Sequence, residues 1–193
     1  IIKCNNDFAS SKYVENKVKT CNSVGIAVKV YNLNPEETNV FDIQRIIIEC
    51  NHNCNATILQ LPLAEHIQGF EDYLLSSIYP THDIDGLTAK NKINLINKSE
   101  ETLVPCTALA VFKIMEHEFE TTDFSGKKVC IVNRSNLIGK PLSTLLLNHN
   151  ATVTVAHSKT CDDINKHFLD YDYDVIVTGI GKHIIYEGLI NGS

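Results

Sequence analysis

Short apolar runs alternate with helical patterns through the second half of the chain, and this alternation constrains the fold more than any other feature. The runs 127–132, 151–156 and 174–179 have the length and β-branched content of buried strands. Helical patterns that end at Leu147 and span 162–171 separate them, with short turns between. A β-α-β-α-β order of this kind requires parallel strands joined by crossover helices. We therefore expect a Rossmann-like, doubly wound parallel sheet.

The first half shows the same alternation in a less regular form. The predicted elements are a helix from near Tyr13 to Gly25, a strand over 27–31, a helix that begins at Asn34-Pro35, and a strand over 56–63. Helix and strand in turn again favour parallel pairing. Helical patterns over 88–97 and after Pro105 follow. We expect an α/β protein of two α/β domains, residues 1–104 (incomplete at its N-terminus) and 105–193 (its C-terminal part missing).

Composition argues against several classes of protein. A net charge of −6 and a pI of about 5.7 disfavour nucleic acid and anionic membranes as partners. No apolar run approaches the roughly 20 residues of a membrane-spanning helix. Seven cysteines, an odd number without a CxxC motif, favour a reducing compartment. We expect a cytoplasmic protein, with an organelle left open, that binds neither nucleic acid nor membranes.

The segment Cys50-Asn-His52-Asn-Cys54 contains residue types that bind metals. It lacks a fourth ligand at a usual spacing, and a helix end followed by a polar loop explains it more simply. We therefore predict no metal site.

The turn after the first strand of the second half is a candidate nucleotide site. Asn133 stands where a dinucleotide fingerprint has its first glycine, and Gly139 follows six residues later. Asn tolerates left-handed backbone angles, so we expect the tight turn to survive this exchange. The helix N-terminus that follows attracts phosphate. A P-loop is excluded, because Gly139-Lys140 is followed by Pro141.

The end of the second strand of this half indicates which dinucleotide binds. NAD-binding domains usually place an acid there to bind the ribose hydroxyls, but the segment AHSKT, 156–160, contains none. Its hydroxyls and cation, together with Arg134 of the first turn, suit a 2′-phosphate. We predict NADP rather than NAD; a solvated polar turn is the alternative.

Three polar features of the first half could share one site. Tyr13 and Lys17 are four residues apart and hence neighbours on one helical face. Gln60 lies at the carboxyl end of a predicted strand, where open α/β sheets bind ligands, and Asp83 and Asp85 lie in one loop. A lysine near an amide can transfer protons, and an aspartate can accept paired N–H bonds from a nitrogen heterocycle. Taken singly, each is better explained by packing, surface charge or turn formation.

Six segments in a fixed order are more specific. Through nearly its whole length the chain resembles the methylenetetrahydrofolate dehydrogenase/methenyltetrahydrofolate cyclohydrolase family. The segments that carry the resemblance are SSKYVENKVKTCNSVGI, ILQLPLAEHI, HDIDGL, LVPCTALA, VNRSNLIGKP and ATVTVAHSKT. The resemblance implies two α/β domains flanking a cleft that binds tetrahydrofolate substrates, NADP as cofactor, and a homodimer formed through the cofactor domains.

The resemblance also implies roles for individual residues. The substrate site would consist of Tyr13, Lys17, Gln60, Leu61, Pro62 and Asp85, of which all but Leu61 and Pro62 would also be catalytic. Lys17 would be the catalytic lysine, Gln60 would hydrogen-bond it, and Asp85 would anchor the polar edge of the pterin, which Tyr13 flanks. The cofactor would contact Asn133, Arg134, Ser135, Ile138, Gly139, His157 and Ser158, with the 2′-phosphate on Arg134 and Ser158.

The activity implied is oxidation of methylenetetrahydrofolate with NADP⁺, then hydrolysis of the methenyl product to 10-formyltetrahydrofolate. The chain departs from the family at Asn133, which replaces a glycine, and at Ala108, which replaces a proline. The alternatives are a dehydrogenase without cyclohydrolase activity, a non-catalytic nucleotide-binding module, and an amino-acid or shikimate dehydrogenase. The last of these leaves QLPL and DIDG unexplained.

Overall fold

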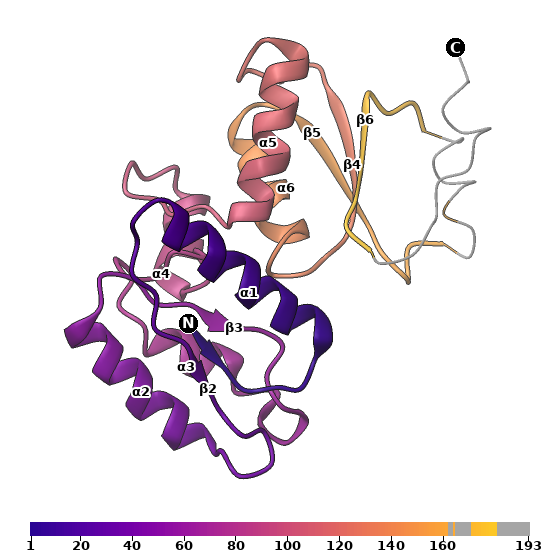
Figure 1. Ribbon diagram of the computed structural model, residues 1–193. Helices are drawn as coiled ribbons and strands as arrows, with labels where there is room; N and C mark the ends of the chain where they lie inside the picture. Colours follow the sequence, from indigo (N-terminus) through magenta and orange to yellow (C-terminus); the bar gives the residue numbers. More distant parts are fainter. Residues whose placement is uncertain (162–163, 165–170, 181–193) are drawn as a thin grey trace. The chain divides into compact units, whose positions relative to one another are not determined.

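Residues 1–161, 164 and 171–180 are described by the computed structural model (Figure 1). The chain divides into two compact units, Ile1–Asn91 and Lys92–Ser193. This boundary lies 13 residues before the one expected from the sequence, since the segment 92–104 belongs with the second unit. Both units are built from helices and parallel strands, so the expected α/β class is confirmed.

The first unit is a small parallel sheet with helices. Its elements are β1 (Ile2–Lys3), α1 (Phe8–Ser23), β2 (Tyr31–Asn32), α2 (Val40–Asn53), β3 (Leu59–Gln60), the 3-10 helix η1 (Glu65–Ile67), α3 (Glu71–Ser76) and the start of α4 (Ala89–Ile96). The strand order is β2-β1-β3, and Ile2 pairs with Tyr31 on one side and Leu59 on the other. The sequence did not predict β1, which is the central strand.

Both predicted strands, 27–31 and 56–63, are reduced to two residues in the structure, and the first overlaps its predicted range only at Tyr31. The central strand β1 has only two residues, so its neighbours pair with it only at Tyr31–Asn32 and Leu59–Gln60. Pro62 then lacks the N–H that a longer β3 would need. The peptide bond between Leu61 and Pro62 is cis.

Two helix starts differ from the prediction because other side chains cap them. The helix α1 begins at Phe8 rather than near Tyr13, since the carboxylate of Asp7 accepts a 2.6 Å bond from the backbone N–H of Ser10. The helix α2 begins at Val40, where Asn39 and Asp42 form a reciprocal capping box. Asn34 instead begins a single turn, which its carbonyl closes by accepting from the N–H of Thr38 at 3.0 Å.

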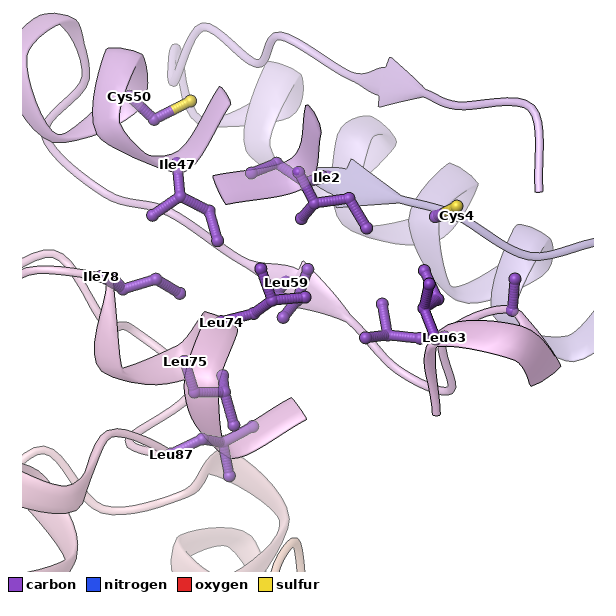
Figure 2. Packing of buried hydrophobic residues seen from close by; sticks show 13 residues of the cluster. Ile2, Cys4, Ile47, Cys50, Leu59, Leu63, Leu74, Leu75, Ile78 and Leu87 are labelled. Atoms are coloured by element: carbon purple, nitrogen blue, oxygen red, sulfur yellow. The ribbon is translucent and has the colours of Figure 1, made fainter. Parts of the chain in front are cut away.

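The core of the first unit lies where α2, α3 and the three strands meet (Figure 2). Ile2 and Leu59 project from the sheet, Ile47 from α2 and Leu74 from α3. Each of these four side chains is at most 2% exposed. Burying this apolar surface is the main force that holds the short strands in register.

The second unit contains the parallel sheet expected from the sequence. Its elements are the end of α4, α5 (Cys106–Phe119), β4 (Lys128–Val132), α6 (Gly139–Asn148), β5 (Thr152–Ala156) and β6 (Val175–Thr178). The strand order is β5-β4-β6, so the chain reverses direction across the sheet at β4. This order confirms the doubly wound arrangement. The helix predicted over 162–171 lies almost entirely outside the described residues.

A second hydrophobic cluster supports this sheet. Phe112 of α5, Val129 of β4 and Leu142 of α6 are buried in it, and Phe124 is fully buried in the turn before β4. The rings of Phe112 and Phe124 meet edge to face, with centroids 5.6 Å apart. None of the helices that the structure describes is both long and apolar enough to span a membrane.

Candidate functional site

Lys17 lies between an amide and a carboxylate in the first unit. Its Nζ atom is 3.3 Å from Oε1 of Gln60 and 3.7 Å from Oδ2 of Asp85. The three residues come from α1, from β3 and from the loop before α4, respectively. The side chains of Lys17 and Asp85 are 34% and 25% exposed, so the group is open to solvent on one side. The structure therefore brings together three of the four residues expected to be catalytic.

Gln60 is oriented by the chain that follows it. Its Nε2 atom donates to the carbonyl of Leu61 at 2.9 Å, which leaves Oε1 to accept from Lys17. The carbonyl of Pro62 accepts a 2.6 Å bond from Asn5, whose amide also donates to Ser10 of α1. The loop after β3 is thus tied to the start of the helix that carries Lys17. Leu61 packs against the core and Pro62 is exposed.

Asp85 has a perturbed carboxyl group. Burial raises its pKa above the ordinary value, Lys17 opposes this shift, and the nearby charge of Asp83 adds to it. The carboxylate of Asp85 is therefore partly desolvated, and it remains paired with Lys17. It can accept N–H bonds from a ligand at its exposed side.

Tyr13 lies one helical turn before Lys17 on α1 and is 63% exposed. An exposed aromatic ring one helical turn from Lys17 can provide a flat apolar surface for a planar ligand. Its place on the face that carries Lys17 is the one expected from the spacing of four residues.

Asn133 links three elements at the carboxyl end of the second sheet. Its Oδ1 atom accepts from the backbone N–H groups of Ser135, at 2.7 Å, and Gly139, at 3.1 Å. Its Nδ2 atom donates to the carbonyl of Gly179 at 2.6 Å. The side chain therefore joins the end of β4, the start of α6 and the residue just after β6, at the switch point of the sheet.

The expected reason for an Asn in this turn was wrong. Positive φ angles occur, among non-glycine residues of the described chain, only at Lys98, Glu120 and Asn150. Asn133 therefore keeps an ordinary backbone conformation. Its amide, rather than a left-handed backbone, shapes the turn.

Close packing in the rest of this turn is found at Gly139. A Cβ atom on Gly139 would lie 2.0 Å from the carbonyl oxygen of Asn133, so only glycine fits there. The hydroxyl of Ser135 accepts from the N–H of Ile138 at 3.1 Å. Arg134 is exposed at the start of the turn.

The turn after β5 begins beside the turn after β4. Val132 and Ala156 are paired residues at the ends of the two strands, so Arg134 and Ser158 each follow by two residues at one edge of the sheet. The N–H of His157 donates to the hydroxyl of Thr160 at 2.9 Å, which closes the second turn and leaves Ser158 exposed. A cation and a hydroxyl at this edge suit a phosphate group.

The segment 50–54 is the end of a helix. Residues 50–53 form the last turn of α2 and Cys54 is its C-cap. Within the described residues no group of three His, Cys, Asp or Glu side chains is arranged to hold a metal ion.

A hollow of about 580 Å³ in the second unit is not part of either residue group. Its lining includes Asp123, which precedes β4, and His149 and Asn150, which precede β5, so it lies at the amino ends of the strands. Its polar groups are used within the chain: Asn150 donates to Asp123 at 2.9 Å, and Nδ1 of His149 lies 2.8 Å from the carbonyl of Thr122. The candidate cofactor residues of this unit lie instead at the carboxyl ends of the strands.

Both units match models of one protein family. The catalytic domain of tetrahydrofolate dehydrogenase/cyclohydrolase matches residues 1–85, and the NAD(P)-binding domain of the same family matches residues 105–192. The chain belongs to this family. The resemblance on which the sequence interpretation depends is therefore confirmed.

Relatives from bacteria, archaea and eukaryotes share the sequence and the fold. Bifunctional protein FolD of Agathobacter rectalis is 37% identical over 94% of this chain and 63% of its own length. The protein of that name from Cenarchaeum symbiosum is 38% identical over 91% of the chain and 60% of its length. The crystal structure of bifunctional FolD from Campylobacter jejuni, at 35% identity, superposes with a TM-score of 0.82 and covers 93% of this chain and 62% of its own.

A further solved structure is the methylenetetrahydrofolate dehydrogenase-cyclohydrolase (FolD) of Trypanosoma brucei, in complex with NADP cofactor and an inhibitor. It is 31% identical and has a TM-score of 0.83, and the match covers 94% of this chain and 60% of that one. The chain thus spans about three fifths of the length of these relatives.

Sequence reasoning missed Asn5 and, although it named Asp83 with Asp85 as a residue that could share the site, gave Asp83 no role of its own. Asn5 holds the loop after β3, and Asp83 holds the loop that carries Asp85. Neither has a distinctive spacing, and an Asp in a loop is ordinarily read as a turn former. Their roles depend on partners distant in sequence or buried in the fold.

Proposed function

We propose that the protein containing this chain oxidises methylenetetrahydrofolate with NADP⁺ and hydrolyses the methenyl product to 10-formyltetrahydrofolate. The observation that carries the proposal is the position of Lys17, within 3.3 Å of Gln60 and 3.7 Å of Asp85. Membership of the family supports it, as do relatives named as bifunctional proteins.

Lys17 is the residue that moves protons in the hydrolysis. Adding water to the methenyl carbon leaves the water oxygen in the formyl group, puts one proton on the ring nitrogen and releases a second. An amine beside the reacting carbon can take a proton from the water and deliver one to the nitrogen. The bond to Gln60 fixes the position of Nζ, because the Gln60 amide is itself held by Leu61.

The other residues of the first unit bind the substrate. The carboxylate of Asp85 accepts N–H bonds from the polar edge of the pterin, and the exposed ring of Tyr13 lies against its planar system. Leu61 and Pro62 provide apolar surface next to Gln60.

The residues of the second unit fit NADP. Arg134 and Ser158 supply a cation and a hydroxyl for the 2′-phosphate, and the segment 157–161 contains no acid that would repel it. His157 lies beside Ser158, and Ser135, Ile138 and the close-packed Gly139 let the dinucleotide approach the start of α6. When bound, NADP⁺ supplies the hydride acceptor.

A variant of Lys17 separates the two activities. We expect Lys17→Met to lower the rate of methenyl hydrolysis by about 10²- to 10⁴-fold, the usual contribution of a positioned acid–base group. The measurement is the ultraviolet absorbance of the methenyl species in the purified full-length protein. Lys12→Met, on the same helix and 61% exposed, is the matched control. Hydrolysis at the wild-type rate in Lys17→Met would remove Lys17 from this role.

The same assay tests the alternatives. Wild-type protein is given NADP⁺ and NAD⁺ separately, and a higher kcat/KM with NADP⁺ is expected because of Arg134 and Ser158. Accumulation of the methenyl species without hydrolysis would favour a dehydrogenase alone, against which the contact between Lys17 and Gln60 counts. No turnover with either dinucleotide would favour a non-catalytic nucleotide-binding module.

We also infer a homodimer and a reducing, cytoplasmic location. All seven cysteines lie in the described residues and no disulfide joins any two of them, which supports a reducing compartment. The dimer rests on the family resemblance, and light scattering of the full-length protein measures it directly.

A further inference from the structure

Asp83 is a buried acid that the proposed reaction does not use. Its side chain is in the core of the first unit and is only 1% exposed. A carboxylate in such a place is costly unless its oxygens are hydrogen-bonded. The bonds it makes should therefore indicate what it does.

Both hydrogen bonds to the carboxylate of Asp83 close the loop that follows it. Oδ2 accepts from the backbone N–H of Thr88 at 2.7 Å and from Nδ2 of Asn91 at 2.9 Å. The amide of Asn91 also donates to the carbonyl of Pro80 at 3.0 Å. These bonds join residues on either side of Asp85. Asp85 thus sits in a loop that is closed at its base by one buried acid.

The backbone of Asp83 connects this loop to the strand that carries Gln60. Asp83 forms a parallel bridge with Thr57, and the N–H of Thr57 donates to the carbonyl of His82 at 2.7 Å. Thr57 lies two residues before β3. The loop tightens at Gly86, which has a φ of +68° and donates its N–H to the carbonyl of Asp83. Gln60 and Asp85, the two partners of Lys17, are therefore presented by one connected scaffold.

The charge of Asp83 also acts on Asp85. Besides burial, two charged groups shift the pKa of Asp85: Lys17 from α1 lowers it, and Asp83 from its own loop raises it. Gln60, from β3, faces Lys17 and is neutral. Asp83 is thus the like charge in this environment.

We propose that Asp83 is a positioning residue for folate binding: its hydrogen bonds close the loop that holds Asp85 beside Lys17, and its buried carboxylate is a charged neighbour of the group that binds the pterin. The inference rests on the proposed function, because it takes Asp85 to be the group that binds the pterin.

Two substitutions separate the bonds from the charge. In Asp83→Asn the amide oxygen can take the place of Oδ2 and accept the bonds from Thr88 and Asn91. This variant therefore loses the charge but keeps the loop closed. Asp83→Ala removes both. The full-length protein is assayed for kcat and KM for methylenetetrahydrofolate across pH, with circular dichroism to verify folding. Glu15→Gln on α1, 67% exposed, controls for the change in net charge.

The expected results differ between the two variants. In Asp83→Asn the acid limb of the kcat/KM profile moves to lower pH, since loss of a like charge lowers the pKa of Asp85, while KM at neutral pH changes little. In Asp83→Ala, KM rises by roughly tenfold or more with a smaller effect on kcat. The reason is that this variant loses the charge-assisted hydrogen bonds that order the loop carrying Asp85. Asn91→Ala loosens the loop but keeps the charge, so KM rises and the acid limb stays.

Several outcomes overturn the proposal. An acid limb at the wild-type pH in Asp83→Asn refutes the role of the charge, and an unchanged KM in Asn91→Ala refutes the role of the loop. If Asp83→Asn does not fold, Asn91→Ala still tests the positioning. Absence of turnover in the wild-type protein would contradict the proposed function instead. That outcome is distinguishable from the others, because no pH profile of kcat/KM could then be measured.

Discussion

At the scale of single residues, the candidate site contains groups whose burial is unfavourable for the fold. Asp85 is the clearest case, because burial is the largest influence on its pKa and raises it. In the folded state the ionised form is therefore disfavoured relative to the unfolded chain. Such a penalty is absent below the unfolded pKa and is fully present above the folded one. Functional sites often retain groups of this kind at a cost in stability.

Replacing this carboxylate should stabilise the protein at neutral pH. We expect Asp85→Asn to have a higher Tm than wild type at pH 7. The difference should shrink as the pH falls below the ordinary aspartate value of 3.8, where the wild-type group is protonated in both states. Thermal unfolding at several pH values measures this. A Tm gain that is the same at all pH values, or a loss at pH 7, would contradict the assignment.

At the scale of elements, short polar side chains decide where helices begin and how turns are held. Asp7 and Asn39 start α1 and α2 at positions that the apolar patterns did not indicate. Asn133 does more, because its amide bonds at once to Ser135 in the turn after β4, to Gly139 at the start of α6 and to Gly179 just after β6. The turn that enters α6 therefore depends on one side chain rather than on several glycines.

Removing this amide should weaken the second unit. We expect Asn133→Ala to lower the free energy of unfolding by about 1–3 kcal/mol, since it leaves partly buried N–H and C=O groups without partners. Denaturant titration of the full-length protein measures the change. Asn136→Ala is the matched control from the same turn: its exposed side chain bonds only to Lys140 in the described residues, and its effect should stay within about 0.5 kcal/mol. Equal effects of the two variants would show that the bonds of Asn133 are not stabilising.

At the scale of the whole molecule, each of the two units has its own hydrophobic packing. One cluster takes its residues from the first unit, including Ile47, and another from the second, including Leu142. Both side chains are fully buried. The two clusters position different candidate residues. The first supports the segments that carry Gln60 and Asp85, the partners of Lys17, and the second supports the sheet from which the turns after β4 and β5 begin.

Cavities made in the two cores should have local effects. Ile47→Ala and Leu142→Ala each remove buried methyl groups and should cost about 2–5 kcal/mol. Hydrogen exchange read by mass spectrometry should show faster exchange in residues 1–91 for Ile47→Ala, and in the second unit for Leu142→Ala. Faster exchange in both units for either variant would mean that the cores unfold as one.

The sequence alone determined the parallel alternation of the second unit and the family of the chain. It also predicted that Tyr13 and Lys17 share a helical face, because spacing along one helix is a local property. The doubly wound class of the second unit was predicted as well, because short turns between the predicted strands and helices allow few topologies.

Only the tertiary structure decided the features that depend on partners distant in sequence. The two-residue strand β1 limits its neighbours to two paired residues, whatever the length of their apolar runs. Asn133 fits its turn through a bond to Gly179, and the backbone of Asp83 is bridged to Thr57 in another segment of the first unit. A hydrogen-bond partner 46 residues away, as for Asn133, leaves no local pattern, so these roles appear only when the chain is folded.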